Sequence, residues 1–322
     1  MYPAVLPYLR CPVCRAGLAV AETGRAGTAP RTAPRATAAG AVLRCPSGHS
    51  FDVARHGYVD LTGGRATHPG DTAEMVAARA ALLNAGHYRP LAEAIVAAAP
   101  AAAAAGEAPA APRGLVVEVG AGTGYYLAAL LDARPAEVGL AVDVSKPALR
   151  RAATAHPRLS AVRADVWRGL PLADGTASLL LDAFAPRSGA EFHRVLRADG
   201  ALLVVTPTAE HLRELVAACG LLTVDPDKEE RLAATLERWF SLTHSVRLDW
   251  PLRLARDEAH ALVAMGPSAW HAAPASIAAA LAPLGEPVAL TASVRLTLWR
   301  PRPIPQAPGG GPGVGSGDIP ME

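Results

Sequence analysis

The chain has 322 residues, of which 51% are hydrophobic and 19% are charged, and its formal net charge is +2 at pH 7. This length allows one to three domains with a sizeable core. Much of the apolar content is alanine, and the alanine-rich run near 97–111 contains prolines and a glutamate, which excludes a membrane span there. Arg10, Cys11 and Cys14 interrupt any N-terminal apolar signal, so the sequence predicts a cytoplasmic protein without membrane association.

Three of the four cysteines belong to two short knuckles near the start of the chain. Cys11 and Cys14 have the spacing C-x2-C, whereas Cys45 and His49 have the spacing C-x3-H. Each knuckle presents two metal ligands on one tight turn, and two knuckles complete a tetrahedral zinc site. Four protein ligands would leave no open coordination position, so the sequence predicts one structural zinc ion per chain. A reducing cytoplasm argues against a disulfide instead.

Residues 1–65 are predicted to form a zinc-binding ribbon that recognises RNA. Residues 21–40 consist mostly of Ala, Thr, Gly, Pro and Arg and predict a flexible insert in this ribbon. Residues 1–70 carry eight arginines against three acidic residues, a balance of +5. That imbalance favours an anionic partner such as nucleic acid, although a solvated arginine-rich loop would give the same balance.

The rest of the chain is predicted as a linker, a main domain and a tail. Residues 66–112 form a helical linker, in which an Asp-Thr pair caps a helix over 73–84 and Gly86 ends it. From 113 to 300, apolar strands alternate with helices, which predicts an α/β, doubly wound, Rossmann-like domain. The Pro/Gly-rich tail 301–322 is expected to be disordered. As separate units, the main domain should keep its ligand when residues 1–65 are deleted.

The first strand of the main domain leads into the most informative motif of the chain. An apolar run that contains Glu118 is followed by three glycines at alternate positions, namely Gly120, Gly122 and Gly124. Glycine lacks a Cβ and tolerates positive φ, so such a loop allows close approach to a ligand. Tyr125 stands where a dinucleotide site needs its last glycine. The pattern is typical of S-adenosylmethionine (SAM) sites, in which the acid can face the cationic methionine end.

Two further acids stand at the ends of the next predicted strands. Asp143 lies 19 residues after Gly124, near the roughly 20-residue offset at which an acid meets ribose hydroxyls. Asp165 ends the segment that starts at Leu159 and is suited to an adenine amino group. A lone Asp at such a place often caps a helix or a turn. Acids at three consecutive strand ends nevertheless favour a nucleoside site.

Taken together, these segments resemble one family, the 23S ribosomal RNA guanine-N1 methyltransferases, which include the tylosin- and mycinamicin-type macrolide-resistance enzymes. The resemblance runs from about residue 9 to 300 and includes both knuckles, the glycine loop and the stretches 51–59, 70–75, 85–91, 143–146, 184–186, 206–207, 211–212 and 265–270. It implies a SAM-dependent, guanine(748)-N(1)-type methyltransferase acting on a 23S rRNA hairpin beside the peptide exit tunnel, macrolide resistance, homodimerisation and RNA recognition through the zinc unit. It also implies that SAM is contacted by Tyr88, Gly124, Tyr125 and His211. The 21–40 insert departs from the shorter family ribbon, which puts the local RNA contacts in doubt.

The chemistry of methyl transfer suggests one catalytic candidate. Guanine N1 carries a proton at neutral pH, and a carboxylate near the methyl group would help to remove it. Asp182, two residues before Phe184, is the candidate base, although it could equally cap a loop. Phe184 could stack on a flipped guanine or be a core aromatic. Two alternatives stay open: a methyltransferase for a quinone or other metabolite, and a non-enzymatic zinc-ribbon RNA-binding regulator.

Overall fold

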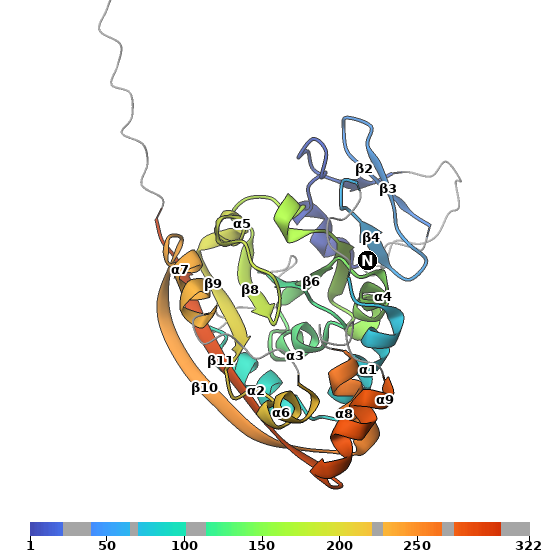
Figure 1. The fold of residues 1–322 in the computed structure, drawn as a ribbon. Helices are drawn as coiled ribbons and strands as arrows, with labels where there is room; N and C mark the ends of the chain where they lie inside the picture. The colour runs from blue at the N-terminus through green and yellow to red at the C-terminus, as the bar shows by residue number, and fades with distance from the viewer. Residues whose placement is uncertain (22–39, 65–69, 101–113, 221–227, 266–273, 304–322) are drawn as a thin grey trace, which may run out of the picture.

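The computed structural model describes residues 1–21, 40–64, 70–100, 114–220, 228–265 and 274–303. The expectations for a flexible insert and a disordered tail therefore fall almost entirely outside the described residues. An eight-stranded sheet crosses the molecule in the order β10-β11-β9-β8-β5-β6-β7-β4 (Figure 1). Its strands are β4 (Tyr58–Asp60), β5 (Gly114–Val119), β6 (Glu137–Asp143), β7 (Leu159–Arg163), β8 (Ala177–Ala183), β9 (Leu196–Pro207), β10 (Phe240–Leu254) and β11 (Val288–Pro301).

The inner strands of this sheet pair in parallel, as expected of a doubly wound domain. Neighbouring strands in the series β4, β7, β6, β5, β8 and β9 pair in parallel with one another, whereas β11 is antiparallel to both β9 and β10. Every residue of β5 is buried, which explains its continuous apolar run, because a parallel strand is covered on both faces. The predicted Rossmann-like fold is thus confirmed.

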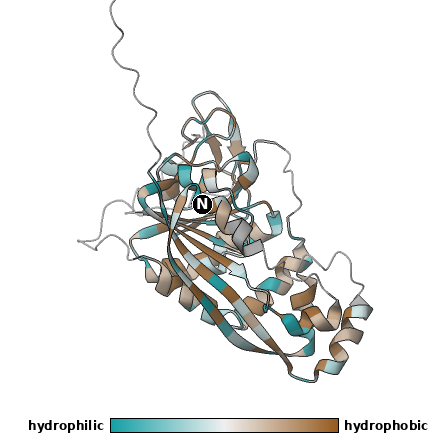
Figure 2. Cartoon of the chain, turned by 60° about the vertical axis from the view of Figure 1, so that its left-hand side comes forward, coloured by the Kyte–Doolittle hydropathy of each residue, from teal (hydrophilic) through white to brown (hydrophobic). Residues whose placement is uncertain are grey.

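Two hydrophobic cores cover the two faces of the sheet. One core packs α3 (Tyr125–Ala133) and α4 (Lys146–Ala155) against alternate residues of β5, β6 and β8. The other core packs α5 (Gly189–Val195) and the N-terminal 3-10 helix η1 (Pro3–Tyr8) on the opposite face. Figure 2 shows the inner strands mainly in the hydrophobic colour, whereas the long β10 and β11 alternate between hydrophobic and hydrophilic residues.

The N-terminal unit is divided between two sheets. β1 (Ala19–Val20), β2 (Val42–Arg44) and β3 (Ser50–Asp52) form a small antiparallel sheet of their own. β4 instead joins the edge of the main sheet, where Val59 pairs with Val162 of β7. Val5, Leu9 and Val59 are completely buried in the second core. Residues 1–65 are therefore not the separate core that the sequence suggested, because one strand and one helix of this segment complete the main domain.

The predicted linker also belongs to the main domain. The expected helix is confirmed as α1 (Ala73–Asn84), whose N-cap Thr72 accepts a hydrogen bond from the Met75 N–H at 3.3 Å. It is followed by α2 (Arg89–Ala98), and both helices bury leucines in the first core. Near them lie α6 (Arg213–Cys219), α8 (Arg256–Ala264) and α9 (Pro274–Leu281), while α7 (Lys228–Glu237) packs near β10 (Figure 1). Among the described helices, none is long and apolar enough to cross a bilayer.

Candidate active site and metal cluster

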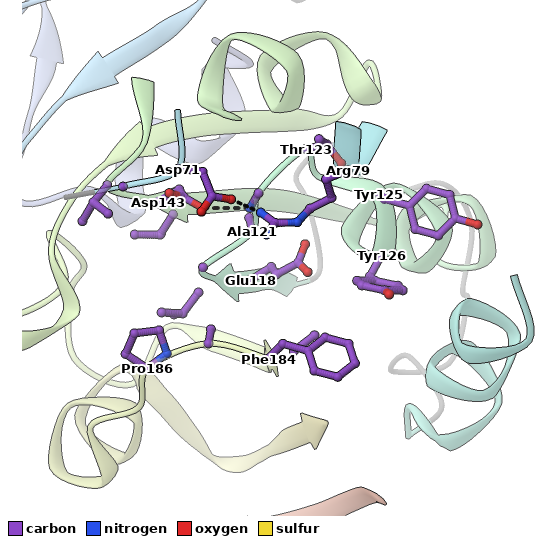
Figure 3. A pocket seen from close by; sticks show the side chains of 18 of the residues that line it. Asp71, Arg79, Glu118, Ala121, Thr123, Tyr125, Tyr126, Asp143, Phe184 and Pro186 are labelled. Atoms are coloured by element: carbon purple, nitrogen blue, oxygen red, sulfur yellow. Dashed lines mark hydrogen bonds and ion pairs between the residues drawn. The ribbon is translucent and has the colours of Figure 1, made fainter. Parts of the chain in front are cut away.

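The carboxyl ends of β5, β6, β7 and β8 open into a cavity of about 570 Å³. Open α/β sheets bind ligands at this edge. The walls come from the glycine loop, the segment 183–186, α1 and the turn after β7, and Figure 3 shows their side chains around one space. The cavity brings together eight of the nine residues predicted to bind the cofactor: Tyr88, Glu118, Gly120, Gly122, Tyr125, Asp143, Asp165 and His211. The ninth, Gly124, lies behind the lining as the N-cap of α3.

The three glycines are required for different local reasons. All three have positive φ, at 64° for Gly120, 54° for Gly122 and 77° for Gly124. A Cβ on Gly120 would lie 2.4 Å from the Cβ of Ala185, so close packing also excludes a side chain there. At Gly122 the nearest atoms lie 3.9 Å away, on Arg79. Gly122 is therefore the glycine whose missing side chain leaves room beside the cavity.

The three acids at the strand ends line the cavity and also fix the turns that follow them. Glu118 accepts a hydrogen bond from the Leu127 N–H at 3.2 Å, and burial raises its pKa well above the usual value. Asp143 accepts bonds from the N–H groups of Gly122 and Ser145, both at 2.8 Å. Asp165 is the N-cap of the short 3-10 helix η2 (Val166–Arg168). The capping interpretation thus holds for Asp165 without excluding a ligand role, since a carboxylate has room for several donors.

His211 and Phe184 lie at the edge of the cavity nearest β8 and β11. The His211 Nδ1 accepts a hydrogen bond from the Ser293 N–H at 3.1 Å, and burial lowers the pKa of the imidazole to about 4. The ring is therefore neutral at pH 7 and its proton sits on Nε2, which can donate. Phe184 has φ 57°, is 43% exposed and lies 6.0 Å from the His211 ring, centroid to centroid. Non-glycine residues held in this region cost about 1–3 kcal/mol and often mark functional sites.

Asp182 does not reach this cavity. It is fully buried on the face of β8 that also carries Leu180, in the core opposite α3. Its carboxylate lies 3.2 Å from Nη2 of Arg187, and burial raises its pKa to about 7, against the opposing effect of Arg187. The structure does not place Asp182 where a general base would touch a substrate. The sequence placed it correctly at a strand end but did not show on which face it points.

The sequence analysis missed two charged residues of the lining, Asp71 and Arg79. Arg79 is the one Lys or Arg among the residues that line the described cavity, and it forms an ion pair with Asp71 (Figure 3). One feature of the sequence could have pointed to Arg79. Within the predicted helix, Arg79 stands three residues after Val76 and four before Leu83, both buried, so it interrupts the apolar face.

The four predicted metal ligands meet in one cluster. Their ligand atoms all lie within 4.8 Å of one another. The Sγ atoms of Cys14 and Cys45 are 3.6 Å apart, and the His49 Nδ1 lies 3.6 Å from Cys11 Sγ and 3.3 Å from Cys45 Sγ. Tetrahedral zinc with ordinary bond lengths would space such atoms by about 3.5–3.8 Å. The donor set and its spacing are therefore compatible with a closed, structural zinc site.

A Rossmann-like sheet with a glycine loop and acids at successive strand ends defines the class of SAM-dependent methyltransferases. A family model described as "Methyltransferase domain" matches residues 116–200. The chain belongs to the 23S rRNA (guanine-N(1)-)-methyltransferase family. A member from Micromonospora griseorubida is 55% identical over 309 residues, which cover 94% of this chain and 100% of that one. The 23S rRNA (guanine(748)-N(1))-methyltransferase of Streptomyces fradiae is 48% identical over 93% of this chain and 99% of its own length. A Bacillus subtilis relative, YxjB, is 33% identical over 82% of this chain and 87% of its own length.

Proposed function

We propose that the protein transfers the methyl group of SAM to N1 of one guanine in a 23S rRNA hairpin near the peptide exit tunnel. The observation that carries this proposal is the cavity at the ends of β5–β8, with eight predicted SAM ligands, in a chain whose relatives are named for this reaction. The guanine(748)-N(1) position and macrolide resistance of the tylosin or mycinamicin type are the finer parts of the proposal.

The cofactor is proposed to follow the order of the strand ends. Asp165 would bind the adenine amino group, Asp143 the ribose hydroxyls, and Glu118 would face the cationic end. When bound, SAM supplies the methyl group on a sulfonium, a good leaving group for in-line displacement. Tyr88 and Tyr125 would contact the same ligand from the α2 and α3 side, and His211 through its protonated Nε2.

The guanine is proposed to enter beside Phe184. An exposed aromatic ring held in a strained conformation at the cavity edge offers a stacking surface for a flipped base. As the methyl–N1 bond forms, the methyl–sulfonium bond would break and release S-adenosylhomocysteine, and the N1 proton would pass to water. Asp182 acts in this scheme as a positioning residue, because it pairs with Arg187, which donates to the carbonyl of Ala185 at 3.5 Å, and because it does not line the cavity.

The N-terminal unit is proposed to hold one zinc ion and to bind the hairpin. Arg44 and Arg55 are exposed there and would contact phosphates of the RNA. Arg15 has another task, since its guanidinium donates to the carbonyls of Leu170 and Leu172 and ties a knuckle to the main domain. A homodimer and a cytoplasmic location, where ribosomes are made, complete the proposal.

Two assays test this function. Primer extension on rRNA from cells with and without the gene should show a stop at one guanine, because N1 methylation blocks base pairing. Transfer from labelled SAM to naked 23S RNA and to extracted metabolites separates the alternatives. Label in a quinone or metabolite fraction alone would support the small-molecule enzyme. RNA binding with no transfer to either substrate would support the regulator.

A further inference from the structure

The charges of the cavity are arranged for a ligand with a particular charge pattern. Its lining contains four carboxyl groups, on Asp71, Glu118, Asp143 and Asp165, and one guanidinium, on Arg79. SAM carries two cations, the sulfonium and the α-ammonium, and one anion, the α-carboxylate. A lining rich in carboxyl groups suits the cations, but the α-carboxylate needs a positive partner, because an unpaired carboxylate is costly away from water. Among the described residues of the lining, Arg79 supplies that charge.

Arg79 is held over the glycine loop. Its Cδ and Nη1 atoms each lie 3.9 Å from the position that a Cβ on Gly122 would occupy. Nη1 donates to the Asp71 carboxylate and Nη2 donates to the carbonyl of Met265 at 3.3 Å. The segment before α1 and the C-cap of α8 therefore fix the orientation of the guanidinium together. A guanidinium has five N–H donors in a fixed fork, and these two bonds leave further donors for a planar carboxylate.

Asp71 is fixed independently of Arg79. Its carbonyl accepts a hydrogen bond from the Ser145 hydroxyl at 2.7 Å, in the turn after β6. The preceding Gly70 packs so closely that a Cβ there would lie 2.7 Å from Ser145 Cα. These contacts with Ser145 hold Asp71 beside the turn after β6, and its side chain faces the cavity (Figure 3). About a quarter of each side chain stays exposed, 26% for Asp71 and 29% for Arg79.

We propose that Asp71 and Arg79 form the recognition site for the amino-acid end of SAM. Arg79 binds the α-carboxylate, and Asp71 binds the α-ammonium together with Glu118, so each charge of the ligand's amino-acid group has a partner of opposite charge. The inference rests on the SAM site proposed above. The pair would select ligands that carry the amino-acid group, and would not discriminate among ligands by their nucleoside.

Calorimetric titration of three nucleosides into the full-length protein tests this assignment. S-adenosylhomocysteine has the complete amino-acid end, decarboxylated SAM keeps the ammonium and the sulfonium but lacks the carboxylate, and 5′-methylthioadenosine has none of these charged groups. Arg79→Gln should weaken S-adenosylhomocysteine roughly 10- to 100-fold and change the other two less than about twofold, because it removes charge-assisted bonds to the carboxylate alone. Asp71→Asn should weaken decarboxylated SAM and leave 5′-methylthioadenosine unchanged. Arg150→Gln, on the exposed face of α4, is the matched control and should change nothing.

The outcomes separate this inference from the proposed function. If the wild-type protein binds none of the three nucleosides, the SAM site itself is wrong. If it binds them and Arg79→Gln weakens S-adenosylhomocysteine and 5′-methylthioadenosine equally, the ion pair only supports the fold and the inference is overturned. No change in either ligand would overturn it as well. Should Arg79→Gln fail to fold, Arg79→Lys keeps the charge without the fork, and the same ratio of affinities decides.

Discussion

Deleting residues 1–65 should unfold the methyltransferase domain and not merely remove an RNA-binding appendage. The deletion removes β4 from the edge of the sheet and η1 from its face. It uncovers Leu140, Val142 and Val162, which are at most 1% exposed. Exposing one such side chain forfeits about 1.5–3 kcal/mol, so the three together forfeit roughly 5–9 kcal/mol. A domain of this kind has only about 5–15 kcal/mol of unfolding free energy in total.

Circular dichroism melting and SAM titration of the truncated chain measure this effect. We expect no cooperative transition and no SAM binding, even though the deletion spares every residue that lines the cavity. Deletion of 21–40 alone is the matched control, because it retains the ribbon strands, η1 and β4, and it should preserve both properties. A truncated chain that melts near the wild-type temperature and binds SAM normally would refute the reasoning and restore two separable units.

Three further predictions concern the metal, the loop and the buried acid. Purified protein should hold about one zinc per chain by metal analysis, and Cys45→Ser should lose both the metal and the folded ribbon, since binding and folding are coupled; a zinc-free, fully folded wild type contradicts this. Gly122→Val should abolish SAM binding by calorimetry, because φ 54° strains a β-branched residue, and Asp143→Ala should weaken it by roughly 1–3 kcal/mol; unchanged titrations would count against the loop assignment. Burial raises the pKa of Asp182 to about 7, so at pH values between about 4 and 7 the folded chain holds a proton that the unfolded chain has lost. The free energy of unfolding should therefore fall as pH rises through this range. Denaturant titration across that range should show a shallower fall for Asp182→Asn, and an identical slope would show that Asp182 does not titrate this way.

The features that were predicted correctly depend on short stretches of sequence. The glycine loop, the acids at strand ends and the two knuckles are each contiguous patterns, and the structure brings them together as the doubly wound topology requires. Thr72 and the helix after it were likewise found from a local capping signal.

What was missed depends on packing between distant segments. Asp71 and Arg79 join the site only because α1 lies over the glycine loop, although their segment reads as a linker. β10 was not singled out, since its polar residues alternate along a solvated edge and Pro251 interrupts the pattern. The side to which Asp182 points depends on strand register, which a run of apolar residues does not define.

The entry of β4 into the main sheet has a consequence for how a target nucleotide is chosen. β4 pairs with β7, and Asp60 and Arg163 reinforce the join through an ion pair of 2.8 Å. The same β7 leads into Asp165, so paired strands join the proposed RNA-holding unit to the proposed adenine site. A hairpin gripped by the ribbon would meet the methyl donor at a fixed offset. On the proposed function, this fixed distance between the ribbon and the methyl donor would select which guanine is methylated.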